Sequence, residues 1–239
     1  MELLRPGMHV HLVGIGGIGL SAIARVLHGW GYTVSGSDMQ PSALLDDLIA
    51  EGIVAYPSHK AGQVAGAQIV VVSSAIPDDN PEVREALRRG LQVVKREQFL
   101  SDLTEGKLTI AVAGTHGKTT TSAMISWILI QAALEPTFIV GGLLQNLGTN
   151  ARAGTGPHFV IEADEYDRAF LGLNPNVAVI ASMEHDHPDC YPTLEAMTEA
   201  FHQFAGQVVE GGLLIVCGED ERGKELGLRK QAQGHRVET

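Results

Sequence analysis

The stretch Ala111-Val-Ala-Gly-Thr-His-Gly-Lys-Thr-Thr-Thr121 decides the fold. An apolar run at residues 108–112 leads into it and predicts a buried strand, whereas residues 122–134, rich in Ala, Ile, Met and Leu, predict a helix. A glycine loop between a strand and a helix is typical of a phosphate-binding site, because glycines let backbone N–H groups turn inward and the helix N-terminus adds partial positive charge. The residues expected to bind a polyphosphate are Gly114, Thr115, His116, Gly117, Lys118, Thr119 and Thr120.

Two side chains of this loop have roles that their spacing predicts. Lys118 would reach the β- and γ-phosphates, and the Thr119 hydroxyl would be a Mg²⁺ ligand. The match to the standard P-loop pattern is partial, because Val112 occupies the place of its first glycine and Gly114 comes two residues later. The alternative is a glycine-rich turn with an incidental Gly-Lys-Thr, which the flanking strand and helix disfavour.

Composition excludes several classes of protein. The 239 residues, 44% of them hydrophobic, suffice for two modest domains of an ordinary α/β protein. A net charge of −11 without any Lys/Arg cluster argues against nucleic-acid binding. Only two cysteines, Cys190 and Cys217, favour a reducing cytoplasm over a disulfide framework. With no leader-like segment and no apolar run approaching about 18 residues, we expect neither export nor a membrane span.

A second glycine motif lies near the start of the chain, between an expected strand at residues 8–13 and an expected helix at 20–29. Gly14-Ile-Gly-Gly-Ile-Gly19 fits the strand-to-helix corner of a dinucleotide-type fold, and Asp38 ends the next strand at the position of a ribose-binding acid. The residues expected to bind a nucleotide here are Gly14, Gly16, Gly17, Gly19, Asp38, Ser73 and Ser74, the two serines following a strand at 67–72. The alternatives are glycines that serve only helix packing, an aspartate that only caps a turn, and a plain turn at 73–80.

Strands and helices alternate along the whole chain. Further strands at 32–36, 53–56 and 91–94, with helices at 42–51, 81–89 and 96–103, predict a Rossmann-like parallel-sheet domain over residues 1–104. The strands 137–140, 158–161, 177–181 and 212–217, with helices 193–204 and 221–231, predict a P-loop ATPase-type α/β domain over 105–239. This second domain is expected to be truncated, since another strand begins near residue 236. Residues 141–152 predict a long loop, either an active-site flap or a surface excursion.

Carboxylates and histidines follow two of the strands in the second half. Glu162-Ala-Asp-Glu-Tyr-Asp167 follows one apolar strand and Ser182-Met-Glu-His-Asp-His-Pro-Asp189 follows the next. Carboxylate oxygens at the end of a strand suit Mg²⁺, and the alternative is a solvated acidic loop. His185 and His187 lack the helical spacing of zinc hydrolases, so we do not predict a zinc protease.

Together these motifs resemble those of the Mur ligases. The motifs that carry the resemblance are residues 11–21, 35–38, 73–76, 114–121, 148–151, 162–165 and 184–187, in that order. The resemblance implies that the first domain holds the UDP part of a sugar nucleotide and that the second binds ATP. It also implies that Lys118, Glu162 and His187 are catalytic and that Thr119, Glu162 and His187 hold Mg²⁺.

The branch of the family that the chain is most similar to implies a cytoplasmic ligase that joins L-alanine to the lactyl carboxylate of UDP-N-acetylmuramate, for peptidoglycan synthesis. A related branch attaches recycled peptides to the same sugar nucleotide and shares the 162–167 segment. Mur ligases carry a third, C-terminal domain, so the resemblance further implies a fragment that is inactive alone. From other classes, a nicotinamide-dependent oxidoreductase would account for residues 14–19 and Asp38 only, and a nucleotide-binding regulatory module is the third alternative.

Overall fold

The computed structural model describes residues 4–239 and divides into two compact units. The first unit runs to Leu103 and takes in Ala151–Ala153. The second consists of Thr104–Asn150 and Gly154–Thr239. Each unit contains one sheet, and the two are described separately below.

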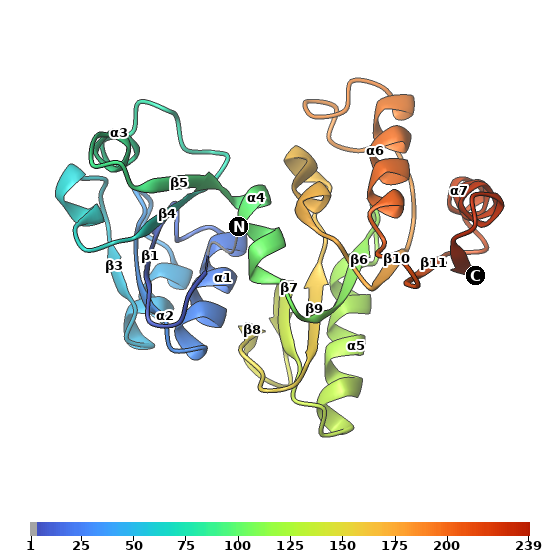
Figure 1. Ribbon diagram of the computed structural model, residues 1–239, viewed down its shortest axis with the longest axis horizontal. Coiled ribbons are helices and arrows are strands. Elements are labelled where there is room, and N and C mark those ends of the chain that lie inside the picture. The colour runs from blue at the N-terminus through green and yellow to red at the C-terminus, as the bar shows by residue number, and fades with distance from the viewer. Residues whose placement is uncertain (1–3) are drawn as a thin grey trace. The chain divides into compact units, whose positions relative to one another are not determined.

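The first unit is a five-stranded parallel sheet in the order β3-β2-β1-β4-β5 (Figure 1). Its strands are β1 (His9–Val13), β2 (Thr33–Ser37), β3 (Val54–Tyr56), β4 (Ile69–Val72) and β5 (Gln92–Lys95). Its helices are α1 (Ile18–Gly29), α2 (Ala43–Ala50), α3 (Pro81–Arg88) and α4 (Arg96–Leu103), with a short 3₁₀ turn, η1, at Ala61–Val64. Every residue of β4 is buried, as the continuous apolar run predicts for a strand covered on both faces.

Local sequence explains where these helices begin. The Ser42 hydroxyl accepts a hydrogen bond from the Leu45 N–H at the start of α2, and the Asn80 side chain accepts bonds from the first turn of α3. Pro81 follows Asn80 at the first helical position, where its missing N–H costs nothing. The expected Rossmann-like parallel sheet is confirmed, and only η1 has no counterpart in the sequence prediction.

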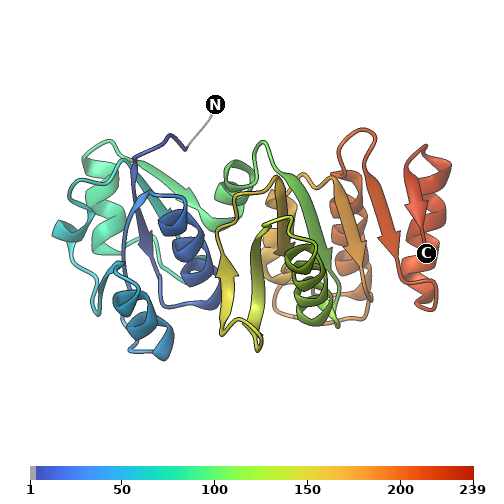
Figure 2. The ribbon, with the colours of Figure 1, turned by 90° about the horizontal axis from the view of Figure 1, so that it is seen from below.

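The second unit is a seven-stranded sheet in the order β12-β11-β10-β6-β9-β7-β8. Its strands are β6 (Leu108–Ala113), β7 (Thr137–Leu144), β8 (Thr149–Arg152), β9 (His158–Glu162), β10 (Val177–Ile180), β11 (Leu213–Val216) and β12 (Arg236–Glu238). Its helices are α5 (Lys118–Gln131), α6 (Leu194–Gly206), α7 (Glu221–Ala232) and the 3₁₀ segment η2 (Tyr166–Gly172). Figure 2 shows β11, α7 and β12, in red, at one edge of this sheet.

The central strand of the second sheet is β6, which carries the glycine loop. It pairs in parallel with β10 and with β9. Ala113 lies opposite Ile180, and Val112 lies opposite Glu162, so the three strands end at the same edge. The α/β class expected from the sequence is confirmed, and the segments following these three strands converge.

The long loop expected at residues 141–152 is wrong. β7 continues to Leu144 and β8 begins at Thr149, so only residues 145–148 connect the two paired strands. The sequence pattern predicts that Gly141 and Gly142 belong to a loop, but they lie within β7. A glycine inside a strand often marks the close approach of another group, and Glu162 occupies that space at Gly141.

The helix after the glycine loop begins earlier than expected, at Lys118 instead of residue 122. Gly117 caps it with a left-handed conformation (φ 82°) that favours glycine, and no side chain caps this end. Lys118 and Thr119 therefore lie on the first helical turn. In the part of the chain that the structure describes, no helix is long and apolar enough to cross a membrane.

Candidate nucleotide-binding site

The glycine loop of the second unit packs closely against the segment that follows β10. A Cβ added to Gly114 would lie 2.8 Å from the Ser182 nitrogen and 3.0 Å from the Ala181 nitrogen, both backbone atoms. Gly114 also has φ 135°, which side-chain-bearing residues rarely adopt. Position 114 therefore requires glycine for two independent reasons.

Hydrogen bonds fix the loop at this contact. The Thr115 hydroxyl donates to the Glu184 carbonyl at 2.9 Å and accepts from the Glu184 N–H at 2.8 Å. The His116 N–H donates to the Ser182 hydroxyl at 2.8 Å. Thr115 and His116 are among the residues predicted to bind a polyphosphate, and these bonds join them to the segment after β10. The loop is thus braced before any ligand binds, and the N–H groups of the first turn of α5 have no intrahelical acceptor.

Lys118 is folded back onto its own loop. Its ammonium donates to the Gly114 carbonyl at 2.6 Å and to Glu165 Oε1 at 2.8 Å, with the Thr115 carbonyl at 3.4 Å. The Lys118 side chain is 14% exposed, and that of Glu165 is 1% exposed. The charge of Lys118 therefore stands at the glycine loop, where the sequence predicted it.

Thr119 and Glu162 form a pair of oxygen donors beside the loop. The Thr119 hydroxyl donates to Glu162 Oε1 at 3.1 Å, and the Gly141 N–H donates to Glu162 Oε2 at 2.7 Å. A Cβ at Gly141 would lie 2.5 Å from Glu162 Oε1. The carboxylate is consequently held between α5 and β7 by a glycine that leaves room for it.

Glu165 is the buried member of the acidic segment. Burial raises the pKa of its carboxyl group above the ordinary value, and the hydrogen bond from Lys118 offsets this only in part. Its backbone carbonyl accepts a hydrogen bond from the Tyr191 hydroxyl at 2.6 Å. His187 Nε2 lies 3.8 Å from Glu165 Oε1, so Glu165 links the glycine loop to the segment after β10.

These donors fit Mg²⁺, although no group of three His, Cys, Asp or Glu side chains among residues 4–239 is arranged to hold a metal. Mg²⁺ characteristically takes one or two protein oxygens and completes its shell with phosphate and water. The Thr119 hydroxyl and Glu162 carboxylate are hard oxygen donors of that kind, 3.1 Å apart. His187, the third expected ligand, contacts Glu165 and Asp186.

The glycine motif of the first unit lies at the edge where β1, β2 and β4 end together. Val13 is opposite Ser37 on one side and Val72 on the other. This edge, between β1 and β4, is the point where the strand order reverses, and ligands of open α/β sheets bind at such points. A Cβ at Gly14 would lie 2.9 Å from the Ser73 side chain, so these two expected residues are brought together. Ser74 is exposed beside them.

Asp38 also lies at this edge, and it binds the loop itself. The Gly16 N–H donates to Asp38 Oδ2 at 3.0 Å, and a Cβ at Gly16 would meet the same carboxylate. The Gly17 N–H donates to the Gly14 carbonyl at 3.2 Å. A Cβ at Gly19 would collide with the Arg96 guanidinium, so a cation lies beside the N-terminus of α1. The sequence analysis did not predict this cation.

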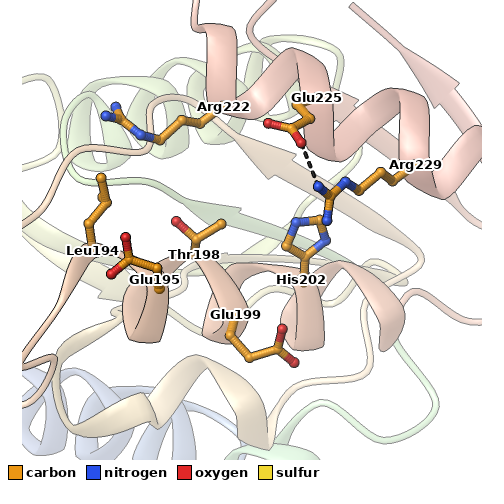
Figure 3. A pocket seen from close by; sticks show the side chains of 8 residues that line it. All are labelled: Leu194, Glu195, Thr198, Glu199, His202, Arg222, Glu225 and Arg229. Carbon is orange, nitrogen blue, oxygen red and sulfur yellow. Dashed lines mark hydrogen bonds and ion pairs between the residues drawn. The ribbon is translucent and has the colours of Figure 1, made fainter.

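A separate groove of about 250 Å³ lies between α6 and α7 (Figure 3). Its two arginines both have partners: Arg229 pairs with Glu225 at 2.5 Å, and Arg222 donates to the Met183 carbonyl at 3.2 Å. The other lining residues are Leu194, Glu195, Thr198, Glu199 and His202. This mixture of charges does not resemble an anion site, and none of the residues predicted for function lies in it.

Four residues that shape the sites were not singled out from the sequence. They are Gly141, Glu165, Ser182 and Arg96. Glu165 and Ser182 lie inside the polar segments 162–167 and 182–189 that the sequence analysis identified. The run of polar residues after each strand indicates the segment but does not show which of its residues contacts the glycine loop. Arg96 opens a helix far along the chain from Gly19, and only the fold brings the two together.

Fold and sites define an α/β protein with two glycine-loop corners, one of them with a lysine and oxygen donors beside it. Family comparison makes the assignment specific. Residues 9–108 match the model described as Mur ligase family, catalytic domain, and residues 112–239 match the Mur ligase middle domain. The chain belongs to the Mur ligase family, as its motifs predicted.

Individual relatives agree with this assignment. The UDP-N-acetylmuramate–L-alanine ligase of Salinibacter ruber is 49% identical over 212 residues, which are 88% of this chain and 45% of the relative. That of Renibacterium salmoninarum is 46% identical over 230 residues, 96% of this chain and 50% of the relative. The chain thus spans about half the length of the curated relatives it matches.

Two solved structures are similar to this chain at 31% sequence identity. One is the UDP-N-acetylmuramate:L-alanyl-gamma-D-glutamyl-meso-diaminopimelate ligase of Neisseria meningitides, with a TM-score of 0.87 over 97% of this chain and 77% of that one. The other is the UDP-N-acetylmuramate-alanine ligase of Thermotoga maritima, with a TM-score of 0.82 over 92% of this chain and 51% of that one.

Proposed function

We propose that the protein is an ATP-dependent ligase that joins L-alanine to the lactyl carboxylate of UDP-N-acetylmuramate in the cytoplasm, as a step of peptidoglycan precursor synthesis. The observation that carries the proposal is the position of Lys118 and Thr119 on the first turn after the glycine loop, in contact with Glu165 and Glu162 respectively. The curated relatives at 46–49% identity, all L-alanine ligases by name, support this choice of substrates.

The reaction would proceed in two displacements. A lactyl carboxylate oxygen attacks the γ-phosphorus of ATP, the bond to the bridging oxygen breaks, and an acyl phosphate and ADP form. The L-alanine nitrogen then attacks the acyl carbon, phosphate leaves, and the nitrogen loses a proton. The protein contributes position and charge rather than covalent chemistry, since two anions must approach each other. Lys118 and the N–H groups at the start of α5 would stabilise the charge on the transferred phosphoryl group.

Thr119 and Glu162, with His187 as the third ligand that the family implies, would hold Mg²⁺. The ion would supply charge neutralisation on the phosphate oxygens. The Thr119 hydroxyl donates to the Glu162 carboxylate, which keeps both oxygens at the loop.

The glycine corner of the first unit would bind the UDP moiety. Gly14, Gly16, Gly17 and Gly19, with Ser73 and Ser74, line the end of β1 and β4, and helix α1 has no side-chain cap at its N-terminus. Asp38 accepts a hydrogen bond from the Gly16 N–H, so its main role would be to hold the loop in shape. Contact with the nucleotide would be its second role. Arg96 beside Gly19 would offset the charge of the diphosphate.

A second candidate keeps the same sugar nucleotide and changes the amine. The structural likeness to the tripeptide ligase, with a TM-score of 0.87, favours it as strongly as the L-alanine ligase structure favours the first. Phosphate release with UDP-N-acetylmuramate and ATP separates the two, measured with L-alanine and with L-alanyl-γ-D-glutamyl-meso-diaminopimelate on a protein of the relatives' full length that contains this chain. We expect release with L-alanine; release with the tripeptide alone would replace the first candidate by the second.

Binding titrations test the class of the protein. We expect Mg²⁺-ATP and UDP-N-acetylmuramate each to bind this chain, with Lys118→Ala weakening the first and sparing the second. Tight NADH binding without ATP binding would instead establish the nicotinamide-dependent alternative.

A further inference from the structure

The ammonium group of Lys118 has no donor left over for a ligand. It carries three N–H donors, and its three acceptors are the Gly114 carbonyl, the Thr115 carbonyl and Glu165 Oε1. A phosphate that pairs with Lys118 must therefore replace at least one of these acceptors. The carboxylate of Glu165 is the acceptor most similar to a phosphate, because it too is an anionic oxygen.

Glu165 is held in place independently of Lys118. Its backbone carbonyl is bonded to the Tyr191 hydroxyl at 2.6 Å, and the chain turns sharply after it, with Asp167 and Arg168 at φ 54° and 56°. Left-handed conformations are uncommon for such residues and are found mainly where surrounding structure imposes them. The backbone conformation at the start of η2 therefore places the side chain of Glu165 beside the glycine loop at residues 114–117.

This placement is costly for the folded protein. The carboxylate is 1% exposed, and its Oε2 has no hydrogen-bond partner among the described residues. Buried polar atoms normally have a hydrogen-bond partner, so this oxygen gains nothing from the protein groups described around it. Among the described residues, the ammonium group that contacts Glu165 is that of Lys118, through Oε1.

We propose that Glu165 is a positioning residue that holds Lys118 against the glycine loop in the nucleotide-free protein and competes with the nucleotide phosphates for its ammonium group. This inference rests on the proposed function, because it takes residues 114–120 as the ATP site. Nucleotide binding then exchanges one anionic partner of Lys118 for another. When the nucleotide leaves, Glu165 takes the ammonium back, which favours product release.

The proposal predicts the sign of a change in affinity. Replacing Glu165 by Gln removes the competing charge but leaves Lys118 bonded to the Gly114 carbonyl. ATP, titrated calorimetrically in EDTA so that no metal takes part, should bind about tenfold more tightly, the low end for a hydrogen bond between charged groups. A purely structural role for Glu165 predicts the opposite sign, since a disturbed loop binds more weakly.

Two further variants make the test specific. In a Lys118→Ala background, Glu165→Gln should no longer tighten ATP binding, because the competition acts through Lys118. Asp167→Asn removes the same charge from an exposed position two residues away, and asparagine tolerates the left-handed backbone there, so we expect no change. Should Glu165→Gln not fold, Glu165→Asp withdraws the carboxylate by one methylene and should tighten binding to a smaller extent.

Equal or weaker ATP binding by Glu165→Gln would overturn the proposal, as would tightening that persists without Lys118. Failure of the proposed function is distinguishable from both outcomes: wild-type protein would then show no ATP binding, and Lys118→Ala would change nothing.

Discussion

A methyl group at position 141 would collide with the carboxylate that we assign to Mg²⁺. The Cβ of Gly141→Ala would lie 2.5 Å from Glu162 Oε1 and 2.8 Å from both Oε2 and Cδ. Ordinary contact begins at 3.4 Å, so the carboxylate must withdraw by about 0.9 Å. It is the end of a flexible side chain and can do so, but it then leaves the Thr119 hydroxyl.

The structure separates the functional cost of this change from its cost in stability. Unfolding free energy should change by no more than about 1 kcal/mol, because the loss of the Gly141 N–H bond to Glu162 is offset by the lower chain entropy of the unfolded alanine variant. Displacement of a metal ligand or its support by about 1 Å typically costs about 10- to 100-fold in metal affinity or activity. We therefore expect a 10- to 100-fold loss in the Mg²⁺-dependent part of ATP affinity.

Calorimetric titration of ATP with and without Mg²⁺ measures that part directly. Gly62→Ala is the matched control, because no atom lies within 4 Å of a Cβ there and the backbone is not left-handed. If Gly141→Ala binds Mg²⁺-ATP like the wild type while folding normally, Glu162 is not a metal ligand in this protein and the reasoning is refuted.

The remaining predictions concern stability and are tested by urea unfolding. Gly114→Ala should cost about 2–6 kcal/mol from the clash with Ser182 and the backbone strain, whereas Gly106→Ala, with open space around it, should cost only about 1–2 kcal/mol of strain; equal losses would contradict the close packing of the loop. Glu82→Ala should cost about 3–5 kcal/mol, because His11 Nε2, the Ser37 hydroxyl and the Lys60 N–H all lose this buried acceptor; a loss below 1 kcal/mol would show that this network adds little. Burial alone would raise the pKa of Glu82, but hydrogen bonds from its neighbours outweigh it and hold the pKa below the ordinary 4.5. The stability that Glu82 adds over Glu82→Gln should thus be present above pH 4.5 and disappear as the pH falls through the lower folded pKa; a difference that grows with acid would reverse the assigned sign.

The sheets could be predicted because their strands are continuous apolar runs, each ended by glycine or polar residues. Residues 69–72 and 108–113 carry that signal unmistakably, and Asn80 with Pro81 marks a helix start by capping chemistry. The prediction was wrong at residues 141–144 because two glycines in a strand resemble a loop. Gly141 leaves room for Glu162 of β9 and Gly142 lies close to Thr119 of α5, and no local pattern shows either contact.

The sequence predicted which segments of the chain form the candidate sites, but it did not predict which side chains within those segments contact one another. Four carboxylates lie at the end of β9 or shortly after it, and the sequence does not show which one faces Lys118. Glu165 does so because the chain reverses at Asp167 and Arg168 in a left-handed conformation that their residue types do not favour. Similarly, Thr115 looks like a phosphate ligand in sequence, but its hydroxyl bonds to the backbone of Glu184.

The central claim is that residues 114–120, with Glu162, form a Mg²⁺-triphosphate site. A crystal structure of this chain with a non-hydrolysable ATP analogue and Mn²⁺ in place of Mg²⁺ tests it most directly, since anomalous scattering locates the ion. We predict an anomalous peak within about 2.2 Å of the Thr119 hydroxyl, next to the Glu162 carboxylate, with the phosphates over the first turn of α5. An ion and triphosphate bound elsewhere on the chain would contradict the account.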